Sequence, residues 1–147
     1  MDAIVLGPGD GERHAMGDAW VDIKAGGQQT AGSFYCGEVV IQPGFPGPPP
    51  HVHDRLHDMF YVLEGSLTMR LGDEERAVGA GTFVCVPPGV VHTFSNPGAA
   101  PVRFLNFNTP AGWEGYMRDL AAAAAGGRQL TTQEIGEIAA RNDFRPV

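Results

Sequence analysis

Hydrophobic and polar residues alternate in short runs through the middle of the chain, between positions 33 and 108. The clearest run is 66–71, where every second residue is Leu or Met. Because successive side chains of a strand point to opposite faces, this pattern predicts a strand with one buried face. Similar alternation, or dense runs of apolar residues, predicts further strands at 20–24, 33–41, 59–63, 75–78, 82–86, 92–95 and 102–108.

Turn-forming residues separate these runs. The chain contains 21 glycines and 12 prolines, many of them grouped between the predicted strands, as in Pro87-Pro88-Gly89 and Asn96-Pro97-Gly98. Short strands at close spacing with such turns are typical of an all-β sandwich or barrel. The densest group, PGFPGPPP at 43–50, predicts a stiff extended loop, because proline lacks the N–H needed in a β-ladder.

The period of the apolar residues changes after position 109. Trp113, Tyr116, Met117 and Leu120 follow the spacing i, i+3, i+4, i+7, which predicts an amphipathic helix packed on the barrel rather than on a partner. Thr131 begins a Thr-x-x-Glu capping pattern that predicts a second helix. We therefore expect one domain over 1–147, consisting of an N-terminal arm (1–32), a barrel (33–108) and a helical tail (109–147).

Charge and composition narrow the class of partner. The formal net charge of -7, with no basic cluster, disfavours nucleic acid, and no apolar stretch is long enough for a bilayer. The first residues lack the layout of a signal peptide. Cys36 and Cys85 lie far apart in predicted strands, and we interpret them as buried free thiols. These features predict a cytoplasmic protein whose partner is neither nucleic acid nor a membrane.

Four of the five histidines lie at positions 51, 53, 57 and 92, each beside strand or turn signals. Residues two apart on a strand share a face, so His51 and His53 can direct their imidazoles to a common point. An acid follows this pair, and His92 follows a turn of its own. Imidazole and carboxylate suit a divalent transition metal such as Fe, Mn, Ni, Co, Cu or Zn, with positions left open for water or substrate.

Two motifs in this region resemble those of the cupin superfamily. Residues 44–65 resemble its first motif, G-x5-H-x-H-x(3,4)-E-x6-G, except that six rather than five residues separate Gly44 from His51. Residues 81–96 fit its second motif, G-x5-P-x-G-x2-H-x3-N. The resemblance implies an all-β double-stranded β-helix, or jelly-roll, barrel with short C-terminal helices. It also implies one metal ion held by the usual ligands of that family, which correspond here to His51, His53, Asp58 and His92.

The acidic ligand departs from the family pattern, since Asp58 stands where the motif has Glu. The spacing to Gly65 favours Asp58, whereas the shorter spacing would select His57. Neighbouring strand residues face opposite ways, so we do not expect both at the metal. Another possibility is a site of three histidines, with Asp58 acting through water or orienting a ligand. Either Asp58 or His57 is a candidate for moving protons during catalysis.

The same parity predicts a pocket wall of Phe60, Val62 and Phe94, although these side chains could instead simply fill the barrel. The chain also resembles small bacterial cupins of the quercetin dioxygenase-like group, through stretches such as GPPPHVH and FYVLEG. That resemblance implies a metal-dependent dioxygenase acting on an aromatic or enolic small molecule, and a homodimer. A redox-neutral isomerase or cyclase, and a non-catalytic binding protein, remain alternatives.

Overall fold

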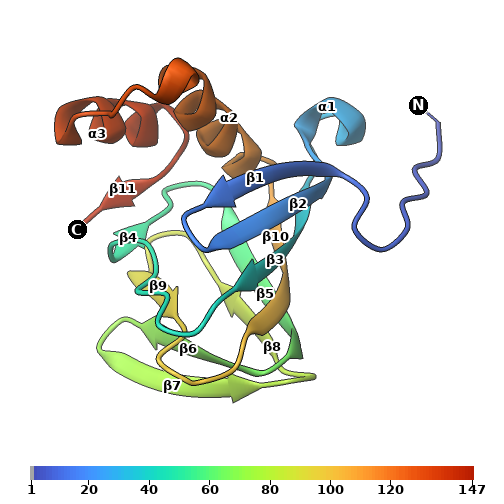
Figure 1. Cartoon of the computed structure of the whole chain (residues 1–147), viewed down its shortest axis with the longest axis vertical. Coiled ribbons are helices and arrows are strands. Elements are labelled where there is room, and N and C mark those ends of the chain that lie inside the picture. The colour runs from blue at the N-terminus through green and yellow to red at the C-terminus, as the bar shows by residue number, and fades with distance from the viewer. Residues whose placement is uncertain (1) are drawn as a thin grey trace.

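Two antiparallel sheets form the body of the protein in the computed structural model, which describes residues 2–147 (Figure 1). One sheet has the strand order β1-β2-β3-β10-β5-β8 and the other has the order β11-β4-β9-β6-β7. The strands are β1 (Glu12–Met16), β2 (Ala19–Ala25), β3 (Tyr35–Ile41), β4 (His51–Val52), β5 (His57–Glu64), β6 (Ser66–Leu71), β7 (Glu74–Gly79), β8 (Phe83–Val86), β9 (His92–Ser95), β10 (Val102–Thr109) and β11 (Arg145–Pro146). The predicted all-β jelly-roll barrel is therefore confirmed.

Helical segments lie mainly at the C-terminal end of the chain. They are α1 (Gly27–Thr30), α2 (Trp113–Ala123), a short 3-10 turn (Ala125–Gly127) and α3 (Thr132–Arg141). Both predicted C-terminal helices are confirmed, and α3 begins with the predicted capping box between Thr131 and Glu134. None of the helices within 2–147 is long and apolar enough to cross a membrane.

The sequence pattern did not predict β1, and it placed the neighbouring strand at 20–24 only. The strand β1 is polar and mostly exposed, and it forms because its backbone pairs with β2 from Glu12↔Ile23 to Met16↔Ala19. An edge strand of this kind carries little hydrophobic periodicity, since most of its side chains meet solvent.

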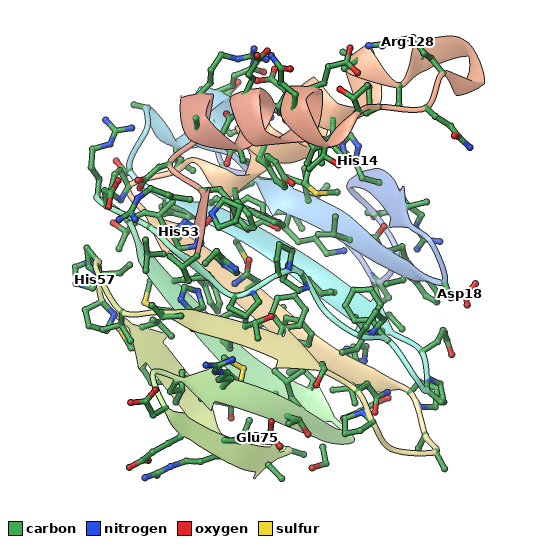
Figure 2. The ribbon with its side chains drawn as sticks, turned by 90° about the vertical axis from the view of Figure 1, so that its left-hand side faces the viewer. His14, Asp18, His53, His57, Glu75 and Arg128 are labelled. Atoms are coloured by element: carbon green, nitrogen blue, oxygen red, sulfur yellow. The ribbon has the colours of Figure 1, made fainter. Side chains whose placement is uncertain are left out.

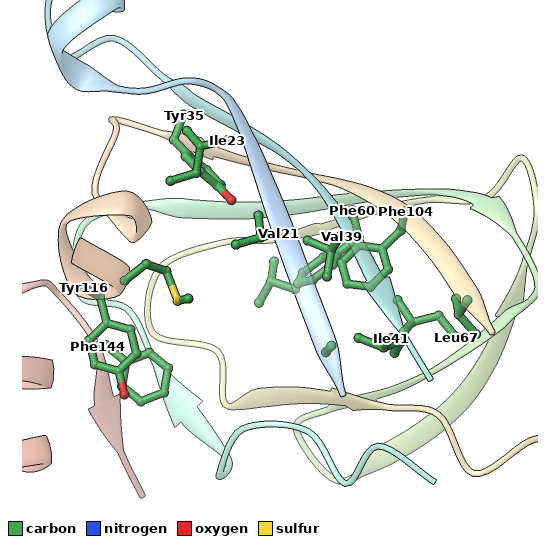
Figure 3. Packing of buried hydrophobic residues seen from close by; sticks show 14 of the residues in the cluster. Val21, Ile23, Tyr35, Val39, Ile41, Phe60, Leu67, Phe104, Tyr116 and Phe144 are labelled. Atoms are coloured by element: carbon green, nitrogen blue, oxygen red, sulfur yellow. The ribbon is translucent and has the colours of Figure 1, made fainter. Parts of the chain in front are cut away.

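The core fills the space between the two sheets. Inward side chains alternate along β3, where Tyr35, Val39 and Ile41 are buried, and along β10. Phe60 of β5 and Phe104 of β10 meet in the middle with ring centroids 5.8 Å apart (Figure 3). This packing fixes which face of each strand points inward, and so it decides which polar residues enter the interior.

The C-terminal segment returns to the barrel after α2 and α3 have crossed one end of it (Figure 1). The strand β11 pairs with β4, placing Pro146 opposite His51. Helix α2 buries Tyr116 and Met117, while α3 buries Ile138 and Ala139. The tail therefore closes the end of the barrel at which β4 lies.

The two cysteines are free thiols, as expected, but only one is even partly buried. Cys36 is half-buried in β3, and burial raises the pKa of its thiol. Cys85 is exposed, which corrects the expectation that both are buried. The reason is parity, because Val86 of the same strand is the buried residue and its neighbour must face outward.

Candidate metal centre

The fold brings together four buried side chains that were predicted as metal ligands. They are His51, His53, Asp58 and His92, here called the metal cluster. One ligand atom from each residue can be chosen such that all four lie within 4.8 Å of one another. Residues separated by 41 positions in the chain thus converge on one point in the interior.

Three strands position the cluster. His51 lies in β4 directly opposite His92 in β9, and their ring centroids are 4.4 Å apart. His53 follows β4 by one residue, with its ring 5.0 Å from that of His51. The i, i+2 spacing therefore delivers both imidazoles to one side, as the sequence indicated.

Asp58 enters the cluster from β5. Its Oδ2 lies 3.0 Å from Nε2 of His92 and 3.6 Å from Nε2 of His53. Its Oδ1 accepts hydrogen bonds from the side-chain amides of Asn106 (2.7 Å) and Asn108 (2.8 Å), both on the adjacent strand β10. One carboxylate oxygen is thus held by the sheet, and the other faces the imidazoles.

Backbone carbonyls orient all three imidazoles. Nδ1 of His51 donates to Pro49 O (2.8 Å), and Nδ1 of His92 donates to Val90 O (3.0 Å). Nδ1 of His53 donates to the carbonyl oxygen of Asp143. Because a carbonyl can only accept, these bonds favour a proton on each Nδ1, which leaves Nε2 to face the cluster as a metal ligand.

The donor set fits a divalent transition metal. A neutral imidazole can donate from only one nitrogen, yet both nitrogens of His92 face oxygen acceptors. The buried carboxylate of Asp58 also requires a compensating positive charge nearby. A cation held by three Nε2 atoms and one carboxylate oxygen meets both requirements, and this is ordinary ligand chemistry for Fe, Mn, Ni, Co, Cu or Zn.

The ionisation states of Asp58 and His51 suit metal binding at neutral pH, whereas burial of His53 is outweighed by its hydrogen bonds to Asp58 and Asp143, which raise the pKa of that imidazole. Burial raises the pKa of Asp58, but the hydrogen bonds and charges of His53 and His92 outweigh burial and lower that pKa to about 2. Burial, reinforced by the neighbouring His92, lowers the pKa of His51 to about 4. Asp58 is therefore a carboxylate and His51 is a neutral imidazole, the forms in which both bind metals.

His57 lies away from the cluster. It is exposed on the outer face of β5 (Figure 2), while its neighbour Asp58 is buried. The two residues therefore face opposite ways, and the structure brings Asp58, not His57, to the three imidazoles. The role of His57 in proton transfer finds no support in this arrangement.

The three residues predicted to line a pocket separate into two groups. Phe60 and Val62 have no exposed surface and belong to the barrel core, so the structure places neither on a cavity wall. Phe94 is half-buried, and its ring packs on Phe60 with centroids 5.7 Å apart. The inward positions of β5 therefore fill the barrel, as is usual in small barrels, and Phe94 alone of the three reaches a cavity.

That cavity has a volume of about 450 Å³ and an apolar wall. It lies between β1, the proline-rich loop and α2, and its wall includes Phe45, Pro48, Pro49, Phe94, Trp113, Tyr116, Met117 and Leu120. Two links join it to the metal cluster. Pro49 holds His51 through its carbonyl group, and Phe94 follows His92 by two residues on β9. We call this space the apolar cavity.

Two pairs of residues beside the metal cluster were not predicted from the sequence. Asn106 and Asn108 could have been found, because they lie two and four residues after Phe104 on the same strand and therefore face inward with it, placing two side-chain amides inside the barrel. Asp143 and Phe144 could not, because their position depends on how the tail folds back onto β4.

Comparisons with known proteins agree with this geometry. Residues 37–108 match the family described as "Cupin domain". Quercetin 2,3-dioxygenase of Bacillus subtilis (strain 168) is 32% identical over 92 residues, which are 61% of this chain. They are only 26% of that protein, so this chain spans about a quarter of its relative.

Solved structures share the fold at lower identity. The polyketide cyclase RemF from Streptomyces resistomycificus superposes with a TM-score of 0.65 and 23% identity, over 74% of this chain and 80% of that one. An RmlC-like cupin from Shewanella frigidimarina NCIMB 400 gives a TM-score of 0.63 and 18% identity, over 76% and 93% respectively. These structures show the shared fold. The domain match over residues 37–108 and the similarity to the dioxygenase, together with the two motifs and the metal cluster, show that the chain belongs to the cupin superfamily.

Proposed function

We propose that this protein is a metal-dependent oxygenase, most specifically a dioxygenase, that acts on an aromatic or enolic small molecule. The observation that carries the proposal is a buried cluster of three imidazoles and one carboxylate beside an apolar, aromatic-lined cavity. The sequence similarity to quercetin 2,3-dioxygenase supports the same class of reaction. Dioxygenase activity is named for that relative, which is much longer than this chain, and for this chain it is a proposal.

In this proposal His51, His53, Asp58 and His92 hold the metal. When bound there, a divalent transition metal would supply Lewis-acid chemistry, and a redox-active one would also supply redox chemistry. The carbonyl groups that accept from each Nδ1 keep the imidazoles in the binding tautomer. The cluster is therefore preorganised by the barrel and by its loops.

Asp58 acts in this proposal as a ligand and as a fixed negative charge. Both hydrogen bonds from β10 reach Oδ1, which leaves Oδ2 for the metal. A carboxyl whose pKa is about 2 is also a weak acceptor for a substrate proton at neutral pH. The apolar cavity excludes water and binds the hydrocarbon part of the substrate, so that its oxygen atoms are directed to the cluster.

The test is dioxygen uptake by metal-loaded protein. Purified chain is loaded separately with Fe²⁺, Mn²⁺, Ni²⁺, Co²⁺, Cu²⁺ and Zn²⁺ and is given catechols and flavonols in an oxygen electrode. We expect uptake with at least one redox-active metal, and its loss in the His51→Ala/His92→Ala double variant. His57→Ala is the matched control, since it removes an imidazole that lies outside the cluster.

Two outcomes would contradict the oxygenase proposal. Uptake that persists in the double variant would assign the reaction to free metal or to another site. Substrate conversion without consumption of dioxygen would replace the oxygenase with a redox-neutral isomerase or cyclase, the alternative that the same fold allows.

A further inference from the structure

The ring of Phe144 fills the space beside the metal cluster. Only 2% of this residue is exposed, although the residues after it are all exposed. Its ring stacks on the imidazole of His51 with centroids 4.1 Å apart and planes 21° apart. It also meets the ring of His53 edge-on at 5.9 Å. A side chain from the C-terminal tail therefore covers two metal ligands.

The same ring adjoins the apolar cavity. Phe144 stacks on Tyr116 of α2 with centroids 4.9 Å apart and planes only 6° apart (Figure 3). It also contacts Trp113, with centroids 5.7 Å apart. Both Tyr116 and Trp113 line the apolar cavity. Removal of the ring would thus extend that cavity to the face of His51.

The chain is anchored firmly just before Phe144. The carboxylate of Asp143 accepts hydrogen bonds from three consecutive backbone amides, those of residues 54–56, at 2.7–3.1 Å. Its carbonyl group accepts from His53. Asp143 has a φ of 56°, in the left-handed region, where the chain turns sharply. This residue therefore stays with the metal cluster whatever the tail beyond it does.

Residues 145–147 are held much more weakly. They pair with β4 over only two residues, Arg145↔Val52 and Pro146↔His51, and Val147 N donates a further hydrogen bond to Pro50 O at 3.0 Å. The ion pair between Arg145 and Asp54 is exposed on both sides, and such pairs stabilise little. Movement of the segment 144–147 about Asp143 would break the hydrogen bond from Phe144 N to Ala139 O (3.1 Å) and the pairing with β4, but not the bond between Asp143 and His53.

We propose that Phe144 occupies a binding slot for one planar aromatic ring of a ligand, which enters by displacing residues 144–147. Stacking against the planes of His51 and Tyr116 favours a flat ring over a puckered one. The apolar cavity, at about 450 Å³, takes the remaining apolar part of the molecule. That this ligand is the enzyme's aromatic substrate rests on the proposed function. Binding of an aromatic ring in the slot, however, requires neither metal nor turnover.

The test measures binding of 2-naphthol to the full chain in the presence of a chelator. Isothermal titration calorimetry gives the affinity. Trp20→Phe is introduced throughout, so that quenching of the one remaining tryptophan, Trp113, reports binding at the slot. Because a closed state lowers apparent affinity by its population, Phe144→Ala should bind 2-naphthol roughly tenfold more tightly or better. Phe144→Tyr refills the slot without adding a tryptophan and should bind no more tightly than the parent.

Two controls make the result specific. Phe83→Ala removes a ring that is 57% exposed on β8 and should leave the affinity unchanged. Decahydro-2-naphthol, which has the same size but is not planar, should gain little affinity in Phe144→Ala. An equal gain for both probes would show that the variant only enlarges an apolar space, and would overturn the slot for a planar ring.

Deletion of residues 145–147 supplies a second variant in case Phe144→Ala fails to fold. It keeps the ring but removes the strand that holds it, so it too should bind 2-naphthol more tightly. Unchanged affinity in the folded variants would overturn the proposal. If 2-naphthol binds more tightly to the variants but the metal-loaded parent takes up no dioxygen, the slot is supported and the oxygenase proposal is rejected. If the parent takes up dioxygen but the variants bind 2-naphthol no more tightly, the oxygenase proposal is supported and the slot is rejected.

Discussion

Asn106 offers a sharp test of how the barrel supports the metal cluster. Its side-chain amide donates to Oδ1 of Asp58 at 2.7 Å, and both side chains are buried. We predict that Asn106→Ala weakens metal binding because Asp58 loses one of the two amides that fix its orientation. Loss of such a partner of a metal ligand typically costs about tenfold to a hundredfold in metal affinity.

The same substitution should also destabilise the protein without metal. A hydrogen bond to a buried charged group contributes roughly 1.5–3 kcal/mol, so the free energy of unfolding should fall by about that amount. Unfolding in urea measures this change on the metal-free chain. Competition between the protein and a chromogenic chelator measures the metal affinity in parallel.

Asn96→Ala is the matched control for Asn106→Ala. Asn96 is also buried, and its side chain bonds only to backbone groups, including Ala100 O at 2.8 Å and Gly98 N at 3.1 Å. It should lose stability and keep its metal affinity. If Asn106→Ala behaves in the same way as Asn96→Ala, the amides of β10 support the fold and not the metal, and the reasoning above is wrong.

Three further predictions concern other parts of the molecule. Hydrogen bonds from Arg118 and from His14 lower the pKa of Glu12 to about 2. These contacts therefore stabilise the protein above pH 4.5, and the stabilisation is lost as pH falls towards 2. In acid unfolding, the free energy of unfolding of Glu12→Gln should fall less than that of the parent over this pH range, by under about 1 kcal/mol because the contact is exposed. Asp58→Glu should retain metal at parental stoichiometry by elemental analysis, and Asp58→Ala should lose affinity. The homodimer expected from the family resemblance should appear in sedimentation equilibrium, and a monomer at high micromolar concentration would contradict it.

Strand periodicity predicted most of the barrel because each core strand has one buried face. The segment 66–71 is the plainest case, since its alternation matches the observed strand Ser66–Leu71 and its burial. Strand β1 shows the limit of this method. It is held by backbone pairing at a solvent-exposed edge, which leaves little trace in side-chain hydrophobicity.

The metal cluster was accessible from the sequence for a similar local reason. The i, i+2 spacing of His51 and His53, and the opposite orientations of His57 and Asp58, follow directly from strand geometry. The surroundings of the cluster depend on long-range contacts instead. Phe144 lies 93 positions after His51, and only the return of the tail to β4 brings the two rings together.

We propose that His51, His53, Asp58 and His92 together bind one divalent metal ion. The most direct measurement is the metal content of purified protein after dialysis, by inductively coupled plasma mass spectrometry, for the parent and for the His51→Ala/His92→Ala double variant. Circular dichroism checks that the double variant is folded. We predict about one metal ion per chain in the parent and almost none in the folded double variant, because two of the four ligands are gone. Full metal content in the folded double variant would contradict the assignment of the site.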